Sequence, residues 1–196
     1  MAEIFFVAIV AFIGTNLDDL LLNTLFYAEA QTPAARRGVV AGKYAGMALL
    51  LAVSLAGAFG LGFLPEAYVG WLGILPIGLG VLTLVRKDDE APAVPDPARA
   101  SSSSAVHTVF RVALVTVANG ADNVGVHVPL FAGYTLRPIL LTVGVFAVLV
   151  ALWCRLGQAL ADLPPMRRGL ERHRRVVIPT VYIALGVYVM LKNWLL

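Results

Sequence analysis

Cysteine is almost absent from this 196-residue sequence, which contains only Cys154. A single cysteine excludes an intrachain disulfide, a CxxC redox pair and a metal cage built from several thiolates. Charged residues are also scarce, at 14%, whereas 59% of the residues are hydrophobic. A soluble domain of this length could not bury that much apolar surface, so we expect the chain to lie in a lipid bilayer.

Sequence signs of an enzyme are missing as well. The chain has no phosphate-binding loop, no cofactor motif and no legible nucleophile–base pair. Its first apolar segment lacks a basic n-region and a small-residue cleavage site, so we do not interpret that segment as a removable signal peptide. We therefore expect no enzymatic activity and no cofactor. A membrane enzyme or assembly factor that uses Asp and His is a less favoured alternative.

Six apolar segments are long enough to cross a bilayer. They cover residues 4–28, 38–61, 68–85, 108–131, 138–160 and 176–196. Between the third and the fourth, residues 86–105 are rich in proline, serine and charge, which predicts a flexible linker. The sequence therefore predicts an all-α integral membrane protein with six transmembrane helices, in which residues 1–85 and 106–196 form two three-helix repeats.

The distribution of basic residues predicts how the chain is oriented. Every Lys and Arg except Arg137 and Lys192 lies near the loops that follow the first, third and fifth segments. Under the positive-inside rule these loops and the linker are cytoplasmic, and both termini are extracytoplasmic. Three spans per half then invert the second repeat relative to the first, as in many secondary transporters. We expect a multi-pass protein of a bacterial-type inner membrane.

Each half carries an acidic motif within its first apolar segment, GTNLDDL in the first half and VANGADNV in the second. An offset of 103 residues aligns Asn16 with Asn119 and Asp19 with Asp122. Asn and Asp three positions apart share one face of a helix. The two halves are thus expected to present equivalent polar groups.

The motifs lie about 14–16 residues into their segments, more than about 20 Å from the helix start at ~1.5 Å per residue. An ionised Asp at mid-bilayer costs roughly 2.5–3.5 kcal/mol on insertion scales. Because Lys43 and Arg111 are expected nearer the cytoplasmic ends, we predict no basic side chain at the depth of Asp18, Asp19 and Asp122. A bound cation, or protons, is then the simplest partner of these carboxylates.

The ligand types in the motifs limit which cation binds. Carboxylates and side-chain amides are hard oxygen donors that suit Mg, Ca or Mn, whereas an imidazole at His127 widens the range towards Zn or Cd. The residues of the predicted site are Asn16, Asp18, Asp19, Asn119, Asp122 and Asn123, with Thr15, Asn23 and His127 as additional candidates.

Two further patterns concern the backbone. Glycines beside both motifs, together with Pro129, are expected to loosen the helices and free backbone carbonyls as ligands. Gly42 and Gly46 form a GxxxG pattern, which predicts close packing of two helices.

The pair GTNLDDL and ANGADNVGVHVPLFA resembles the motifs of the CadD-type cadmium-resistance transporters, within the LysE superfamily. The resemblance extends over nearly the whole chain, and it places the six main site residues at the polar positions of the family motifs. The sequence departs from the family at Ala121, where a second Gly is common, and at His127, where an aromatic residue is common.

The resemblance implies secondary-active efflux of a divalent metal ion of the Cd, Mn, Zn or Ca class, and we prefer coupling to protons. The alternative is export of a basic amino acid or another small organic cation, as in the parent superfamily. The expected partners are the lipid bilayer and the small cation, without nucleic acid. A homo-oligomer is compatible with such a chain.

Overall fold

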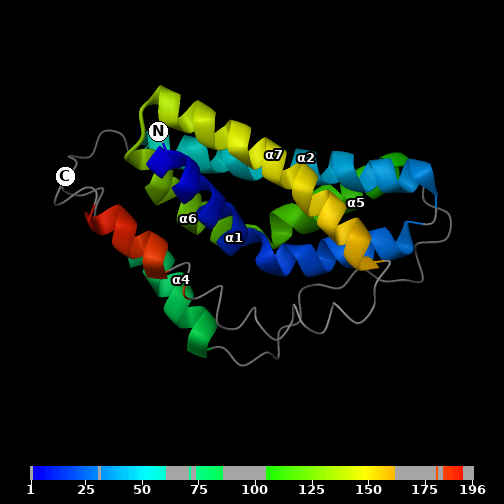
Figure 1. Cartoon of the computed structure of the whole chain (residues 1–196), viewed down its shortest axis with the longest axis horizontal. Helices are drawn as coiled ribbons and strands as arrows, with labels where there is room; N and C mark the ends of the chain where they lie inside the picture. Colours follow the sequence, from blue (N-terminus) through cyan, green and yellow to red (C-terminus); the bar gives the residue numbers. More distant parts are fainter. Residues whose placement is uncertain are drawn as a thin grey trace.

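The structure, a computed structural model, describes residues 2–30, 32–60, 71, 74–85, 105–161, 180 and 183–191. Within these ranges every regular element is a helix, which confirms the predicted all-α class. The elements are α1 (Ala2–Glu29), α2 (Pro33–Gly60), α4 (Ile74–Val85), α5 (Ala105–Ala118), α6 (Ala121–Ala132) and α7 (Leu136–Ala161), and residues 183–191 are also helical (Figure 1).

Two helices, α2 and α7, are long and apolar enough to cross a membrane by themselves. A third candidate span is α1, which bends by 61° between Ala2–Leu17 and Asp19–Glu29. Six separate spans are therefore not confirmed. The predicted linker, apart from Ala105, and parts of the third and sixth segments lie outside the described residues.

The fourth apolar segment differs from the prediction of one continuous helix. It forms two helices, α5 and α6, which are separated at Asn119 and Gly120. The Leu50 side chain of α2 packs directly on Gly120, since a Cβ atom there would lie 2.4 Å from Leu50 Cδ1, so a larger residue at this point would have to displace Leu50. Pro129, by contrast, remains inside α6. The break thus falls within the acidic motif.

The bounds of the helices repeat at the offset that aligns the two motifs. Shifting α1 by 103 residues gives residues 105–132, the first residue of α5 and the last residue of α6. The same shift moves the start of α2, Pro33, onto Leu136, the start of α7. The bent α1 and the broken α5–α6 pair are therefore counterparts. Inversion of the two halves across a membrane stays a prediction.

Helices of opposite halves pack against each other most extensively, α2 against α5 and α1 against α7. Along α2, the contact with α5 is formed at Gly38, Gly42 and Gly46 (Figure 1). Cβ atoms on Gly42 and Gly46 would lie 2.7 Å from the Cβ atoms of Val112 and Thr116. The close packing predicted from the GxxxG pattern is confirmed, because any side chain there would separate the helices.

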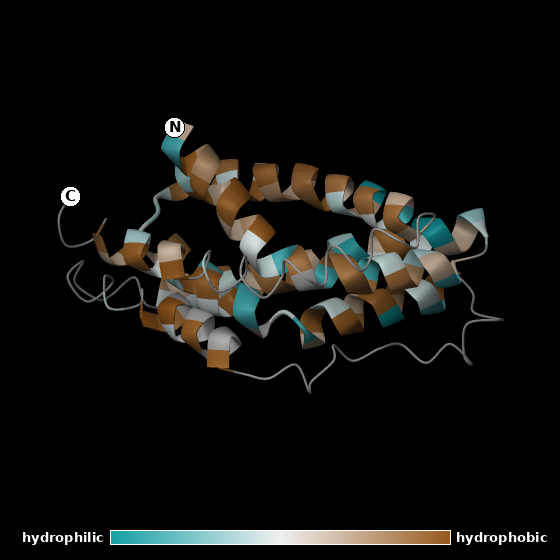
Figure 2. Ribbon diagram, turned by 60° about the horizontal axis from the view of Figure 1, so that its bottom comes forward, coloured by the Kyte–Doolittle hydropathy of each residue, from teal (hydrophilic) through white to brown (hydrophobic). Residues whose placement is uncertain are grey.

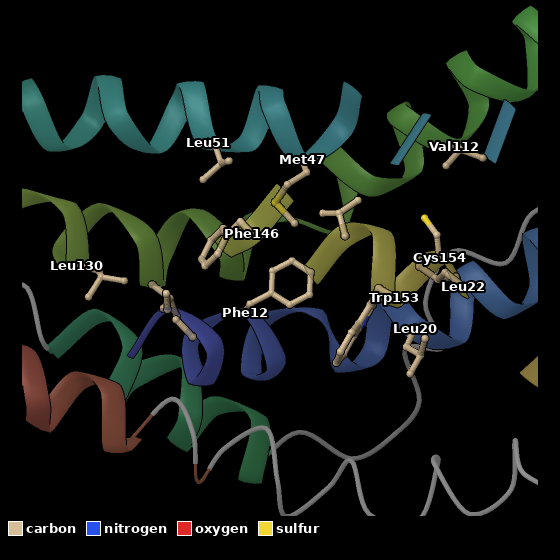
Figure 3. Close-up of a cluster of buried hydrophobic side chains, with 14 of the residues drawn as sticks. Phe12, Leu20, Leu22, Met47, Leu51, Val112, Leu130, Phe146, Trp153 and Cys154 are labelled. Carbon is tan, nitrogen blue, oxygen red and sulfur yellow. The ribbon is translucent and has the colours of Figure 1, made fainter. Parts of the chain in front are cut away.

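The interior between α1, α6 and α7 is filled by aromatic rings. Figure 3 shows the Phe12 ring between those of Phe146 and Trp153, with centroid distances of 5.4 Å and 5.3 Å. Large apolar side chains are also exposed on the helices, where Phe6 of α1 and Phe110 of α5 are 67% and 68% exposed. Hydrophobic residues recur along every helix of the ribbon in Figure 2. Such a surface suits lipid rather than water.

Candidate functional site

The acidic motifs of the two halves meet in the interior. Asn16 Nδ2 of α1 donates a hydrogen bond to Asn123 Oδ1 of α6 at 3.3 Å. In return, Asn123 Nδ2 donates to the backbone oxygen of Thr15 at 3.2 Å. Asn16 and Asn123 are 2% and 4% exposed, so both bonds are shielded from water. The structure therefore brings these three predicted residues together.

Side chains of the second half also hold the bend of α1. Trp153 Nε1 of α7 donates to the backbone oxygen of Asn16 at 2.8 Å, next to the bond from Asn123 to Thr15. Both carbonyls directly precede the bend, where helical backbone bonding is weakest. Polar partners from the protein are required there, because the bilayer core offers none. The bend is thus fixed by contacts between the halves.

Asp122 is the second residue of α6 and is stabilised by the start of this helix. Its Oδ1 accepts a hydrogen bond from the Asn123 backbone N–H at 2.8 Å. The residue lies in the first turn of α6, where the aligned peptide dipoles favour a negative charge. Gly120, the N-cap residue, supplies no side-chain cap. The carboxylate of Asp122 therefore partly satisfies the free N–H groups of this helix end.

Asp19 has a basic partner, which corrects the prediction that no Lys or Arg lies at its depth. The Nζ of Lys43 in α2 forms an ion pair with Asp19 Oδ1. Lys43 is only 4% exposed, and the same Nζ donates to Thr116 Oγ1 of α5 at 3.2 Å. The expectation failed because it counted residues from the helix end, whereas the glycine contact of α2 with α5 carries Lys43 into the interior. Arg111 pairs instead with Glu29 at 2.9 Å.

A small pocket, with a cavity volume of about 10 Å³, or room for roughly one water molecule, lies beside the bend of α1. Three predicted residues, Asn16, Asp19 and Asn23, line it together with Lys43 and the single cysteine. The lining residues are Phe12, Asn16, Asp19, Asn23, Lys43, Met47, Thr116, Val150, Trp153 and Cys154. Carboxylate, amide, hydroxyl and thiol groups thus face one space among apolar walls.

Two further predicted residues are buried with unused polar atoms. Asn23 donates through Nδ2 to the Trp153 backbone oxygen at 2.9 Å, while its Oδ1 has no hydrogen-bond partner within the described part of the chain. His127 is fully buried against Phe131 and Phe146, and neither of its ring nitrogens has a partner among the same residues. A buried polar atom without a partner is unfavourable unless a ligand satisfies it.

The remaining predicted residues stand apart from the pocket. Asn119 bonds through its side chain to Val115 O in its own helix, at 2.9 Å. Neither Asn119, Asp122, Asn123 nor His127 is among the pocket residues. The side chain of Asp18 lies outside the described part of the structure. The predicted residues therefore form a pocket on the α1 side and a polar contact at the start of α6, joined by Asn16 and Asn123.

No group of three or more His, Cys, Asp and Glu side chains comes together among the residues that the structure describes. A metal ion bound here would therefore take a large share of its ligands from amide, hydroxyl or backbone oxygens. Asp19, Asn16 and the free Oδ1 of Asn23 are the oxygen donors of the pocket that best suit this purpose.

The sequence model of one protein family, described as cadmium resistance transporter, matches residues 12–196. The chain belongs to the cadmium resistance transporter family. The match includes both acidic motifs, and it confirms the resemblance noted from them. No curated protein and no solved structure matches the chain significantly. Membership of a transporter family agrees with the apolar helices and with the lack of enzyme motifs.

Most of the pocket residues were not identified as site residues from the sequence, and Lys43 and Cys154 are the two of them with ionisable side chains. The signal for Lys43 is its position inside the Gly42–Gly46 pattern, because a charge between two packing glycines is carried into a helix interface. Cys154 has no comparable sequence signal. Its neighbour Trp153 reaches the bend of α1, but only the fold reveals this.

Proposed function

We propose that this member of the cadmium resistance transporter family is a secondary-active exporter of divalent metal ions. The transported ion binds at the bend of α1 and the start of α6. Asp19, Asn16 and Asn123 contribute there, with Asp122 close to the contact between the halves. Asp18, Asn119, Thr15, Asn23 and His127 complete the set of candidate ligands.

The observation that carries this proposal is the contact between Asn16 and Asn123. It joins the acidic motifs of the two halves where α1 bends and where α5 ends and α6 begins. Discontinuous helices of this kind form ion and substrate sites in many secondary transporters, because helix ends and loosened carbonyls supply polar ligands within the bilayer. In a protein without a polar cargo, polar groups and broken helices within the bilayer would cost free energy with no compensating ligand.

The donors favour a hard or borderline ion. Oxygen atoms from carboxylates and amides suit Mn and Ca, and they also bind Cd and Zn when nitrogen or sulfur is nearby. His127, one turn beyond Asn123, and Cys154 in the pocket provide such atoms. We therefore place cadmium and manganese first among the ions to test.

We propose export rather than uptake because the matched family is described as one of resistance transporters, and we propose that protons drive it. Protons and metal ions compete for the same carboxylate oxygens, so protonation on the outside releases the metal. An imposed pH gradient should then accelerate metal flux, whereas flux that ignores the gradient contradicts this coupling.

The central test uses the purified full-length chain in proteoliposomes that contain a metal-sensing dye. Cadmium or manganese flux should be lost in Asp19→Asn and in Asp122→Asn, because each variant removes a proposed carboxylate ligand. The matched control is Glu3→Gln, an acidic residue at the exposed start of α1 that hydrogen-bonds Tyr188 at 2.9 Å. Glu3→Gln should retain flux. Wild-type flux in both Asp variants would show that the site lies elsewhere.

A second candidate cargo, a basic amino acid or another organic cation, is favoured by the walls of the pocket. Phe12, Trp153, Met47 and Val150 provide aromatic and aliphatic surface beside Asp19. Aromatic rings attract organic cations as well as apolar stems. Lysine or arginine that competes with metal for uptake in the same vesicles would support this cargo. Without such competition, the metal ion remains the proposed cargo.

A further inference from the structure

Lys43 is the one charged residue among the buried side chains of the described ranges. It lies on α2, and its Nζ connects Asp19 of α1 with Thr116 of α5. These contacts join both halves of the chain at the pocket. Burying an ammonium group is costly unless ionic and hydrogen-bonding partners compensate it, and both kinds of partner are present here.

The position of Lys43 follows from the packing of its helix. Gly42 and Gly46 flank it and bring α2 within van der Waals contact of Val112 and Thr116 on α5. A wider separation would remove Thr116 from reach of the ammonium. The close packing of α2 and α5 therefore holds a fixed positive charge against the carboxylate that faces the pocket.

We propose that Lys43 is a tethered counter-cation, which occupies the Asp19 carboxylate when no metal is bound and which the transported metal must displace. This inference rests on the proposed role of Asp19 as a metal ligand. An ammonium group and a divalent ion compete for the same oxygen, and only the ammonium is covalently attached. In the metal-free protein, the ammonium of Lys43 then balances the charge of the Asp19 carboxylate, so no bound ion is needed.

Two consequences follow for transport. First, displacement of Lys43 lowers the apparent affinity for the metal, because only the fraction of protein with Lys43 moved away can bind it. Weaker binding helps an exporter to release its cargo. Second, the empty transporter can return with Asp19 paired, so it avoids an unpaired carboxylate in the bilayer.

Charge removal at Lys43 tests this proposal in the purified full-length protein. Lys43→Gln should bind cadmium or manganese about tenfold more tightly in calorimetric titrations, since no tethered charge competes for Asp19. The maximal flux in proteoliposomes should fall, because release becomes slow. A purely structural ion pair predicts the opposite, because its loss disturbs the pocket and weakens binding. A folded Lys43→Gln protein that binds metal no more tightly than the wild type overturns the proposal.

Arg111→Gln is the matched control, because it removes the cation of a different ion pair, Arg111–Glu29, which lies outside the pocket. Its metal affinity should equal that of the wild type. An equal gain in affinity in this variant would assign the effect to net charge and overturn a specific role of Lys43.

Thr116→Val provides a second test that keeps the charge and the side-chain shape. Loss of the Thr116 hydroxyl weakens the hold on Lys43, so metal binding should tighten by about twofold to threefold. If Lys43→Gln fails to fold, this variant decides the question, and an unchanged affinity overturns the proposal.

Asp19→Asn separates the proposed metal site at Asp19 from the proposed competition by Lys43. If Asp19→Asn loses metal binding while the Lys43 and Thr116 variants bind as the wild type does, Asp19 is a metal ligand but Lys43 does not compete for it. If Asp19→Asn binds metal as the wild type does, both the metal site at Asp19 and the role of Lys43 are contradicted.

Discussion

Asn16 and Asn123 lie 107 residues apart in the sequence, and their side chains form a hydrogen bond of 3.3 Å across the interface of the two halves. Asn123 also supports the helix of Asn16, since it donates to the carbonyl of Thr15 beside the bend of α1. The polar link between the halves therefore coincides with the two places where their helices depart from straight geometry. A substitution of either residue should therefore disturb both the bend of α1 and the start of α6.

Asn123→Ala should lower the free energy of unfolding by about 1–3 kcal/mol, because it leaves the Thr15 carbonyl and the Asn16 amide buried without this partner. Combined with Asn16→Ala, the two losses should be clearly less than additive. Chemical denaturation in detergent measures both. Asn119→Ala serves as the control, since its side chain bonds to Val115 within α5 and its effect should add to that of Asn123→Ala. Strict additivity of Asn16→Ala and Asn123→Ala would contradict the coupling.

Gly42→Ala should destabilise the protein by about 1–3 kcal/mol, because the new Cβ would lie 2.7 Å from both Val109 O and Val112 Cβ. Backbone atoms cannot move aside as a flexible side chain can. Gly144→Ala in α7 is a matched control, with no atom within 4 Å of the added Cβ. It should be neutral or stabilise the helix by up to about 1 kcal/mol. Thermal unfolding in detergent compares the two variants, and equal melting temperatures would show that α2 and α5 are not in close contact.

His127→Leu should raise the stability of the metal-free protein by about 1 kcal/mol, because it replaces a fully buried imidazole whose nitrogens have no partner among the described residues. Its affinity for cadmium should fall more than its affinity for manganese, since nitrogen donors favour the softer ion. Thermal unfolding and calorimetric metal titration measure these effects.

Thr142→Val is the control for His127→Leu. Thr142 of α7 is also fully buried with an unpartnered oxygen within the described ranges, but it is no proposed ligand. This variant should gain stability without any change in metal affinity. If His127→Leu behaves in the same way as Thr142→Val, His127 is a packing residue and not a ligand.

Local patterns in the sequence were sufficient for the all-α class, the helices α2 and α7, and the family. The bounds of α2 and α7 lie within a few residues of the predicted apolar segments, because hydrophobic length and helical periodicity are properties of the local chain. The GxxxG pattern likewise predicted close packing, although it did not identify α5 as the partner of α2. The 103-residue offset of the motifs recurs in the helix bounds for the same reason.

Only the tertiary structure decided what surrounds the motifs. The position of Lys43 beside Asp19 depends on how closely α2 approaches α5, and no count of residues from a helix end contains that information. Likewise, the Leu50 side chain that packs on Gly120 at the break comes from α2, which is distant in sequence. The sequence by itself therefore determined that the two acidic motifs enter the apolar interior, whereas the packing of helices determined which charges meet there, because electrostatic pairing depends on distances through space.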